Sequence, residues 1–197
     1  MQIKTHLGVS IDGLVASADG LPAWDWDPGF DGKSPPPGYS DFMENVGAVV
    51  MGRTTFDQGL PDWKAAWPWG ERPIRVLTHR PLPDGAPATV KASQGGPQAV
   101  VNELKKSGIT NDVQLLGGPN AIQSFIDADQ LDSLGIVVLP VLLESGIPLF
   151  PVKDTHFSQK TWDKSSHKPA KEKVRTMRLD SQKQLEGRAV QMVYAFA

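Results

Sequence analysis

The feature that most constrains this chain is the alternation of strand-like apolar runs with segments of helical spacing. Residues 48–51, 74–77 and 113–116 are too short for helices, and glycine or polar residues follow each of them, as they follow buried strands. Residues 98–107 and the segment after Pro119 place apolar residues three and four apart, as amphipathic helices do. This alternation predicts an α/β fold with a mostly parallel central sheet and helices on both of its faces.

Predicted strands also lie near both ends of the chain. Residues 3–11 alternate apolar and polar side chains, and residues 134–142 are almost all aliphatic, as in a strand that is covered on both faces. Residues 190–196 alternate again, so we expect antiparallel strands at a C-terminal edge of the sheet. The basic segment 160–188 predicts a solvated hairpin. A length of 197 residues without an internal repeat predicts one domain over 1–197.

Composition excludes several classes of function. The chain has 20 Lys and Arg against 22 Asp and Glu, and a net charge of −2 gives no electrostatic basis for binding nucleic acid or an anionic membrane. The absence of cysteine excludes disulfides, thiolate metal sites and Cys nucleophiles. The 4 histidines are scattered, so no metal site is predicted. We find neither a membrane-spanning run nor a secretory signal and expect a cytoplasmic protein.

Polar residues suited to a phosphorylated ligand follow three of the predicted strands. In an open α/β sheet, ligands bind at the carboxyl ends of the strands. Glycine lets a ligand approach the backbone, a helix N-terminus offers free N–H groups, and Arg and Thr donate hydrogen bonds to phosphate. The residues are Gly52, Arg53, Thr54 and Thr55; Thr78, His79 and Arg80; and Leu116, Gly117, Gly118, Pro119, Asn120 and Ala121. An ordinary turn explains each group alone, but their joint placement predicts one binding site.

The long loop 12–38 has residues suited to the substrate side of such a site. A glycine-rich loop can act as a lid that excludes water, and the rings of Trp24 and Trp26 can stack on a flat heterocycle. The alternative is a surface loop whose tryptophans only cover the sheet. Calcium binding is a further alternative, but the aspartates of this loop lack the EF-hand spacing. A short helix with Ser40 as its N-cap is expected over 40–46.

Two further stretches carry a family resemblance. The segment VVMGRTTFD (49–57) resembles the dihydrofolate reductase superfamily. The segment 115–150, LLGGPNAIQSFIDADQLDSLGIVVLPVLLESGIPLF, together with SIDGLVA (10–16), resembles the riboflavin-biosynthesis branch of that superfamily, the RibD C-terminal reductase domain. The resemblance runs from about Gly8 to Phe150. It implies a three-layer, dihydrofolate reductase-like fold with a central sheet of eight strands, a bound NADPH and a homodimer.

The resemblance also assigns roles to the residues at the three strand ends. Arg53 and Thr54 would meet the 2′-phosphate and the pyrophosphate, and Thr78, His79 and Arg80 would hold the 2′-phosphate side of the adenosine. Gly117, Gly118, Asn120 and Ala121 would pass under the pyrophosphate and the nicotinamide. Two arginines near one phosphate favour NADPH over NADH. Gly52, Thr55, Leu116 and Pro119 complete the predicted cofactor site.

Together these features predict an NADPH-dependent reductase of a small heterocyclic substrate, similar to 5-amino-6-(5-phosphoribosylamino)uracil reductase. Hydride transfer needs no protein nucleophile, because the protein only positions the nicotinamide and the acceptor. Asp12, at the end of the first strand, is the first candidate for helping to protonate the acceptor, and Asp41 is the second. The residues predicted to contact the substrate are Trp24, Trp26, Phe42 and Pro140.

Two departures from the riboflavin branch leave the acceptor open. The 197 residues contain no Cys-x-x-Cys and so do not include the zinc deaminase that full riboflavin enzymes join to this domain. Leu116 stands where many members of that branch carry an acidic residue, and it resembles folate-type reductases there. The alternatives are a dihydrofolate reductase-like enzyme with another acceptor and a non-catalytic NADP-binding regulatory module. A structural protein would bind neither cofactor.

Overall fold

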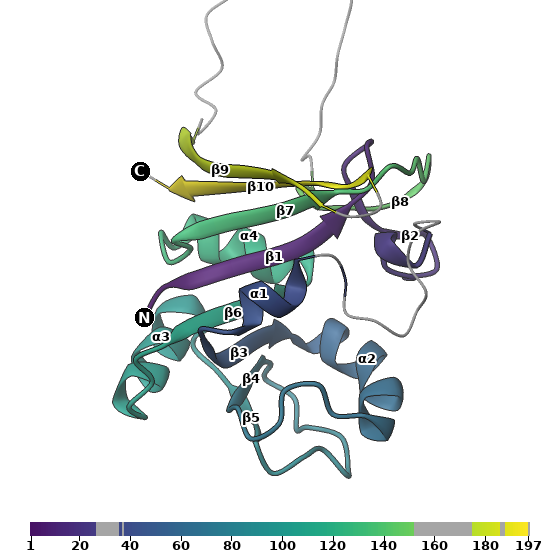
Figure 1. The fold of residues 1–197 in the computed structure, drawn as a ribbon. Coiled ribbons are helices and arrows are strands. Elements are labelled where there is room, and N and C mark those ends of the chain that lie inside the picture. Colours follow the sequence, from purple (N-terminus) through teal and green to yellow (C-terminus); the bar gives the residue numbers. More distant parts are fainter. Residues whose placement is uncertain (27–35, 37, 152–174, 186–187, 197) are drawn as a thin grey trace, which may run out of the picture.

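Eight strands form one twisted sheet in the computed structural model, which describes residues 1–26, 36, 38–151, 175–185 and 188–196 (Figure 1). Their order across the sheet is β5-β4-β3-β6-β1-β7-β10-β9. The strands are β1 (Ile3–Val9), β3 (Val46–Gly52), β4 (Ile74–Leu77), β5 (Val90–Ser93), β6 (Asp112–Gly117), β7 (Ser133–Val138), β9 (Met177–Gln184) and β10 (Val190–Phe196). From β5 to β7 the neighbours are parallel, whereas β10 is antiparallel to both β7 and β9. The predicted mostly parallel sheet with an antiparallel edge is therefore confirmed.

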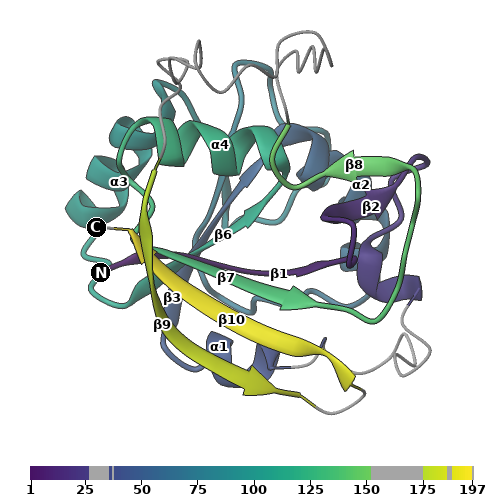
Figure 2. The same ribbon diagram turned by 90° about the horizontal axis from the view of Figure 1, so that it is seen from above.

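Helices cover both faces of the sheet. Helices α3 (Gly96–Lys106) and α4 (Pro119–Asp127) lie on one face and α1 (Tyr39–Met43) lies on the other (Figure 2). Helix α2 (Arg53–Ala65) follows β3 directly at the edge where the parallel strands end, which we call the carboxyl edge. The helical spacing in the sequence is confirmed at α4, because Ile122, Phe125 and Ile126 are all buried.

Within the part of the chain that the structure describes, the buried apolar side chains form three clusters. The largest lies between the sheet and helices α3 and α4. The second, which we call the α2 cluster, consists of Val46, Val49, Met51, Phe56, Leu60, Trp69, Ile74, Val76 and Val90. The third, the η1 cluster, consists of Ala23, Val137, Leu139, Leu185 and Ala189. Ala23 belongs to the 3₁₀-helix η1 (Ala23–Trp26), whose Trp24 packs against the cluster. Two separate clusters, the α2 cluster and the η1 cluster, therefore support different parts of the carboxyl edge.

Some predicted boundaries were wrong. The loop expected over 12–38 contains β2 (Leu14–Ser17) and η1, and β2 pairs with the three-residue strand β8 (Gly146–Pro148). The short helix begins at Tyr39 after Gly38, so Ser40 lies inside it and is not the N-cap. The strand expected over 134–142 ends at Val138, because Pro140 cannot donate a ladder hydrogen bond. None of the helices in the described ranges has the length and apolar character needed to cross a membrane.

Candidate active site

The first and third predicted turns meet at the carboxyl edge of β3 and β6. A Cβ atom on Gly52 would lie 3.6 Å from Gly117 O, from Gly118 N and from the Cβ of Ala121. Gly118 borders Thr55, whose Oγ1 would lie 3.2 Å from a Cβ on that glycine. The Gly117–Gly118 peptide is cis, and Gly117 has a φ of 134°, which side chains rarely allow. These glycines give the edge an open floor of backbone atoms.

Two helices begin at this floor without a side-chain cap. Gly52 is the N-cap of α2 and Gly118 is the N-cap of α4, and neither residue has a side chain to accept a bond from the first turn. Thr54 and Asn120, in the first turns of these helices, are exposed. Free N–H groups and the positive end of the helix dipole suit an anion such as a phosphate group. The edge therefore has two neighbouring positions that favour phosphate.

The second predicted turn lies beside the start of α2. The Thr78 N–H donates to Ser93 O (3.1 Å), and the Arg80 N–H donates to the Thr78 hydroxyl (3.0 Å). These bonds keep Thr78 buried and leave His79 and Arg80 exposed. Arg53 Nη1 donates to the carbonyl of Pro81 (2.7 Å), which joins this turn to α2.

An aspartate that sequence analysis did not single out links the two arginines of the site. Arg53 Nε lies 2.6 Å from Asp57 Oδ1, and Arg80 Nη2 lies 3.8 Å from Asp57 Oδ2. The Arg53 side chain is only 15% exposed, whereas that of Arg80 is 69% exposed. The spacing of four residues between Arg53 and Asp57 on a helix was the sequence signal that could have identified this pair. All three strand ends thus contribute to one region of the carboxyl edge.

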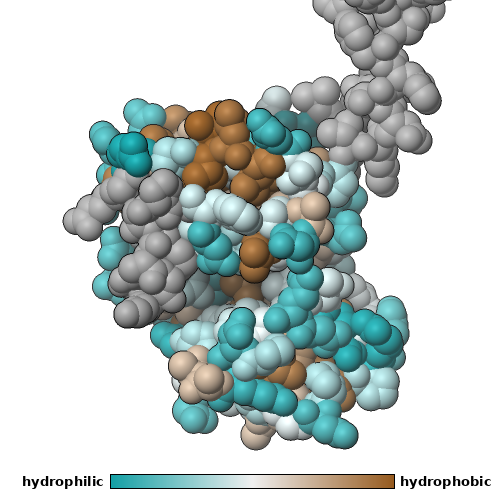
Figure 3. Space-filling model, turned by 90° about the vertical axis from the view of Figure 1, so that its right-hand side faces the viewer, coloured by the Kyte–Doolittle hydropathy of each residue, from teal (hydrophilic) through white to brown (hydrophobic). Residues whose placement is uncertain are grey.

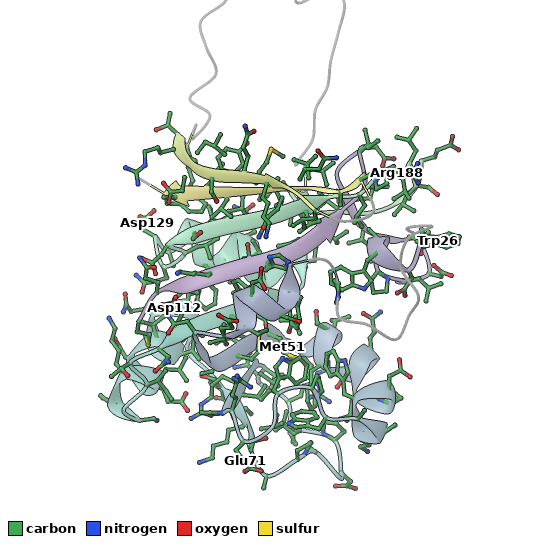
Figure 4. All side chains as sticks on the ribbon, viewed as in Figure 1. Trp26, Met51, Glu71, Asp112, Asp129 and Arg188 are labelled. Carbon is green, nitrogen blue, oxygen red and sulfur yellow. The ribbon has the colours of Figure 1, made fainter. Side chains whose placement is uncertain are left out.

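The η1 helix lies on the other side of this edge. Trp24 packs on β1, where a Cβ on Gly8 would lie 2.7 Å from its Cε3, so this position has room only for glycine. Trp26 is 49% exposed and lies at the outer end of η1 (Figure 4). Pro140 directly follows Leu139, whose Cδ1 would lie 3.1 Å from the same Cβ on Gly8 and which belongs to the cluster that Trp24 packs against. Trp24 and Pro140 therefore lie near the carboxyl ends of β1 and β7.

Segments on the two sides of the edge approach each other. A Cβ on Gly20, in the β2–η1 connection, would lie 3.0 Å from Gln58 Nε2 of α2. Burial, and then the negative charge of Asp62 on α2, raise the pKa of Asp25 on η1. Neither Gln58 nor Asp62 carried a signal in the sequence. Apolar side chains also gather on this side of the molecule (Figure 3). The segments that follow β1 and β7 carry the exposed apolar residues Ile11, Leu142 and Ile147.

The predicted proton donor Asp12 is hydrogen-bonded to the backbone of the segment that follows Pro140. Its carboxylate accepts hydrogen bonds from the N–H groups of Leu143 (3.3 Å) and Glu144 (2.8 Å). A hydrogen bond from the Ser10 side chain, together with those backbone bonds, holds the pKa of Asp12 below its usual value despite the opposing effect of burial. Asp12 is therefore ionised at neutral pH and lies in the turn between β1 and β2.

The predicted residues Asp41 and Phe42 lie on α1, away from the glycine floor. Asp41 Oδ2 is 3.7 Å from Lys183 Nζ of β9, and its side chain is 76% exposed. The Phe42 ring stacks on that of His6 with centroids 5.1 Å apart. Phe42 lines a pocket of about 260 Å³ whose strand residues come from the amino-terminal halves of β1 and β7 and from the edge strands β9 and β10. The structure does not bring these two residues together with Gly52 and Gly117.

Metal ligation has no candidate cluster in the described ranges, since no three His, Asp or Glu side chains meet there as ligands would. The chemistry that this edge offers is anion binding by N–H groups and arginines, next to a tryptophan-covered strand end. Asp27 and Asp31, part of the calcium alternative, lie outside the described residues.

Comparison with known proteins agrees with this architecture. Residues 2–176 match the model of the RibD C-terminal domain family. The uncharacterized protein YwjB of Bacillus subtilis (strain 168) is 33% identical over 152 residues, which cover 76% of this chain and 84% of YwjB. YyaP of the same organism is 28% identical over 161 residues, covering 76% of this chain and 80% of YyaP.

Solved structures share the fold at low identity. A protein of Shewanella sp. PV-4, provisionally named as a riboflavin biosynthesis protein, superposes with a TM-score of 0.77 and 22% identity over 100% of this chain and 99% of its own. The diaminohydroxyphosphoribosylaminopyrimidine deaminase/5-amino-6-(5-phosphoribosylamino)uracil reductase of Thermotoga maritima gives a TM-score of 0.65 at 14% identity, and this chain spans 56% of it. By sequence match and by fold, the chain belongs to the RibD C-terminal domain family.

Proposed function

We propose that this chain is an NADPH-dependent reductase of a small heterocyclic substrate. The observation that carries the proposal is the meeting of Gly52 with Gly117 and Gly118 at the starts of two uncapped helices, next to Arg53 and Arg80. Family membership supports a reductase-type fold. The Thermotoga relative, whose name includes a uracil-derivative reductase, supports a pyrimidine-like acceptor.

The residues present fit a dinucleotide with a phosphate on its ribose. Any side chain in place of Gly52 would fill the space between the two turns, so the floor is open only because it consists of glycine. The first turns of α2 and α4 would hold the pyrophosphate, while Arg53 and Arg80 would bind the 2′-phosphate. NADPH bound there would supply a hydride. Leu116, Pro119, Asn120 and Ala121 would border the nicotinamide side.

The chain's own residues would position the acceptor and exclude water. Trp24, fixed against Gly8, and the neighbouring Pro140 would form an apolar wall beside the nicotinamide side, with Trp26 at its outer rim. Asp25, which directly follows Trp24 on η1, would be the proton donor at this edge, and its pKa, raised by burial and by the charge of Asp62, favours that role. Asp12, held ionised by its hydrogen bonds, would instead fix the loop that follows Pro140.

Ligand-dependent thermal unfolding tests the cofactor part of the proposal. We expect NADPH to stabilise the protein more than NADH does at equal concentration, and a ligand at 100 times its Kd contributes about 2.7 kcal/mol. NADPH oxidation is then followed with a panel of pyrimidine, pterin and flavin-precursor acceptors. Stabilisation by neither nucleotide would contradict the proposal. Binding of NADPH without oxidation by any acceptor would instead favour a non-catalytic NADP-binding module.

A further inference from the structure

The arginine pair of the proposed cofactor site is held by a carboxylate of the same protein. Asp57 lies one turn after Arg53 on α2 and uses one oxygen for each arginine, Oδ1 for Arg53 at 2.6 Å and Oδ2 for Arg80 at 3.8 Å. Arg53 is also bound to the Pro81 carbonyl at 2.7 Å. Two of the nitrogen atoms of its guanidinium thus already have acceptors, and the group is fixed in place by α2 and by the turn after β4.

Asp57 also reduces the positive charge that a ligand meets. Arg53 and Arg80 contribute two positive charges, and the carboxylate between them cancels one. The Asp57 side chain is 37% exposed, so solvent and salt partly screen the interaction between its charge and a bound ligand. A 2′-phosphate placed on these arginines would be repelled by this carboxylate, whereas a 2′-hydroxyl would not.

We propose that Asp57 is a specificity-determining residue that positions Arg53 and Arg80 and limits the selectivity of the site for a 2′-phosphorylated dinucleotide over its 2′-hydroxyl analogue. This inference rests on the proposed function, because it assigns the arginine pair to the ribose side of the cofactor. The carboxylate acts in two separable ways, through the geometry of its hydrogen bond to Arg53 and through its charge.

Substitutions at this position separate charge from geometry. Asp57→Asn keeps an oxygen that can accept from Arg53 Nε, and the Pro81 carbonyl still holds Nη1, so the arginine stays in place while one negative charge disappears. Asp57→Ala also removes the acceptor and frees Nε. Asp57→Glu keeps the charge. Asp62→Asn is the matched control, because it removes the same charge from an exposed position on the same helix.

The experiment measures the Kd of NADPH and of NADH for the wild type and the four variants. We expect Asp57→Asn to raise the ratio of Kd(NADH) to Kd(NADPH) by about three- to tenfold at low ionic strength, and the gain to fade as salt is added. The ratio is expected to be smaller for Asp57→Ala than for Asp57→Asn. Asp57→Glu and Asp62→Asn are expected to leave the wild-type ratio unchanged.

The outcomes distinguish failure of this inference from failure of the proposed function. Wild-type binding of NADPH with an unchanged or lowered ratio in Asp57→Asn would overturn the inference alone. An equal rise in Asp62→Asn would also overturn it, because the effect would then reflect the net charge of the protein. If the wild type binds neither nucleotide, the inference and the proposed function are both overturned.

Discussion

Asp12 and Glu144 are joined by a 2.8 Å hydrogen bond between the carboxylate of the first and the backbone N–H of the second. Ile11 N–H also donates to Val141 O (2.9 Å), and Leu149 N–H donates to Gly13 O (3.0 Å). The two stretches that carried the resemblance to the riboflavin branch, 10–16 and the end of 115–150, are thus bonded to each other. Their joint occurrence in the sequence has a direct structural reason.

Loss of the Asp12 carboxylate should loosen the segment 141–145. In Asp12→Ala we expect faster amide hydrogen exchange at Leu143 and Glu144, whose N–H groups lose their acceptor. Because the pKa of Asp12 is lowered in the folded state, this interaction should persist in mild acid and disappear only as the pH falls through that lowered value. Exchange rates at both amides that match the wild type would show that the Asp12 carboxylate does not hold this segment in place. The exposed Asp84→Ala serves as the control.

Asp112 should contribute to stability in a pH-dependent manner. Its carboxylate accepts from Lys4 Nζ (2.6 Å), Asn45 Nδ2 (3.0 Å) and Gln2 N–H (3.1 Å), linking the starts of β1, β3 and β6. Burial raises the pKa of Asp112, but the hydrogen bonds and the charge of Lys4 outweigh it and lower the pKa overall. We expect Asp112→Asn to lower the free energy of unfolding by about 1–3 kcal/mol at neutral pH.

The sign of that effect is fixed by linkage. A carboxyl group whose pKa is lower in the folded state stabilises the protein above its unfolded pKa and loses this contribution as the pH falls through the folded pKa. Urea unfolding at neutral and at strongly acidic pH measures the difference between Asp112→Asn and the wild type. A difference that is equally large in strong acid would show that the charge is not its cause.

Gly52→Ala should block nucleotide binding while leaving the fold intact. The new Cβ would lie in ordinary contact, at 3.6 Å, with Gly117, Gly118 and Ala121, and Gly52 has a φ of −75°, which alanine adopts without strain. We expect the free energy of unfolding to change by less than about 1 kcal/mol. The Kd of NADPH should rise roughly tenfold or more, because the methyl group occupies the floor. Thr110→Ala, at an exposed position before the amino end of β6, is the control for binding.

Asp25 should make the rate of the reaction depend on pH, with a limb on which the rate falls as the pH rises. Burial and the charge of Asp62 raise the pKa of Asp25, so its protonated form persists to higher pH than that of an ordinary aspartate. We expect the rate of NADPH oxidation to fall as the pH rises through this pKa, Asp25→Asn to abolish this limb of the profile, and Asp62→Asn to shift it to lower pH. An unchanged profile in both variants would exclude Asp25 as the donor.

The same raised pKa predicts a gain in stability for Asp25→Asn. The unfolded chain releases the Asp25 proton at lower pH than the folded protein does, so ionisation of this group destabilises the fold as the pH rises between the two pKa values. Thermal unfolding above that interval should therefore show a higher Tm for the variant. Below the interval the variant and the wild type should unfold alike.

The sequence predicted those elements whose patterns are local. The spacing of Ile122, Phe125 and Ile126 marked α4, and the alternation over 190–196 marked β10. Strand β9 has the sequence MRLDSQKQ with every residue exposed, so no periodicity could reveal it. Strands β2 and β8 pair across about 130 residues, and such pairing has no local sequence signal. The aliphatic run beyond Val138 continues because Leu139 and its neighbours pack against Trp24, outside the sheet.

The candidate site was predicted in part for a similar reason. Parallel strands end at the same edge, so the sequence could place Gly52 and Gly117 at one edge. They meet there because β3 and β6 are neighbours in the sheet, and the sequence did not predict that order. The position of Asp41 depends on where α1 packs on the sheet, and no pattern near the residue encodes that contact. The link from Asp57 to Arg80 joins a helix to a turn and needs three-dimensional coordinates.

The separation of the α2 cluster from the η1 cluster has an evolutionary consequence. Arg53 and Asp57 lie on the helix that packs into the α2 cluster, and Arg80 lies in the turn beside that helix. Trp24 and the residues after β7 pack in the η1 cluster. Mutations that reshape the tryptophan side need not disturb the packing beneath the arginines. Descendants of one ancestral gene can therefore exchange the molecule that they recognise on one side while inheriting the other side unaltered.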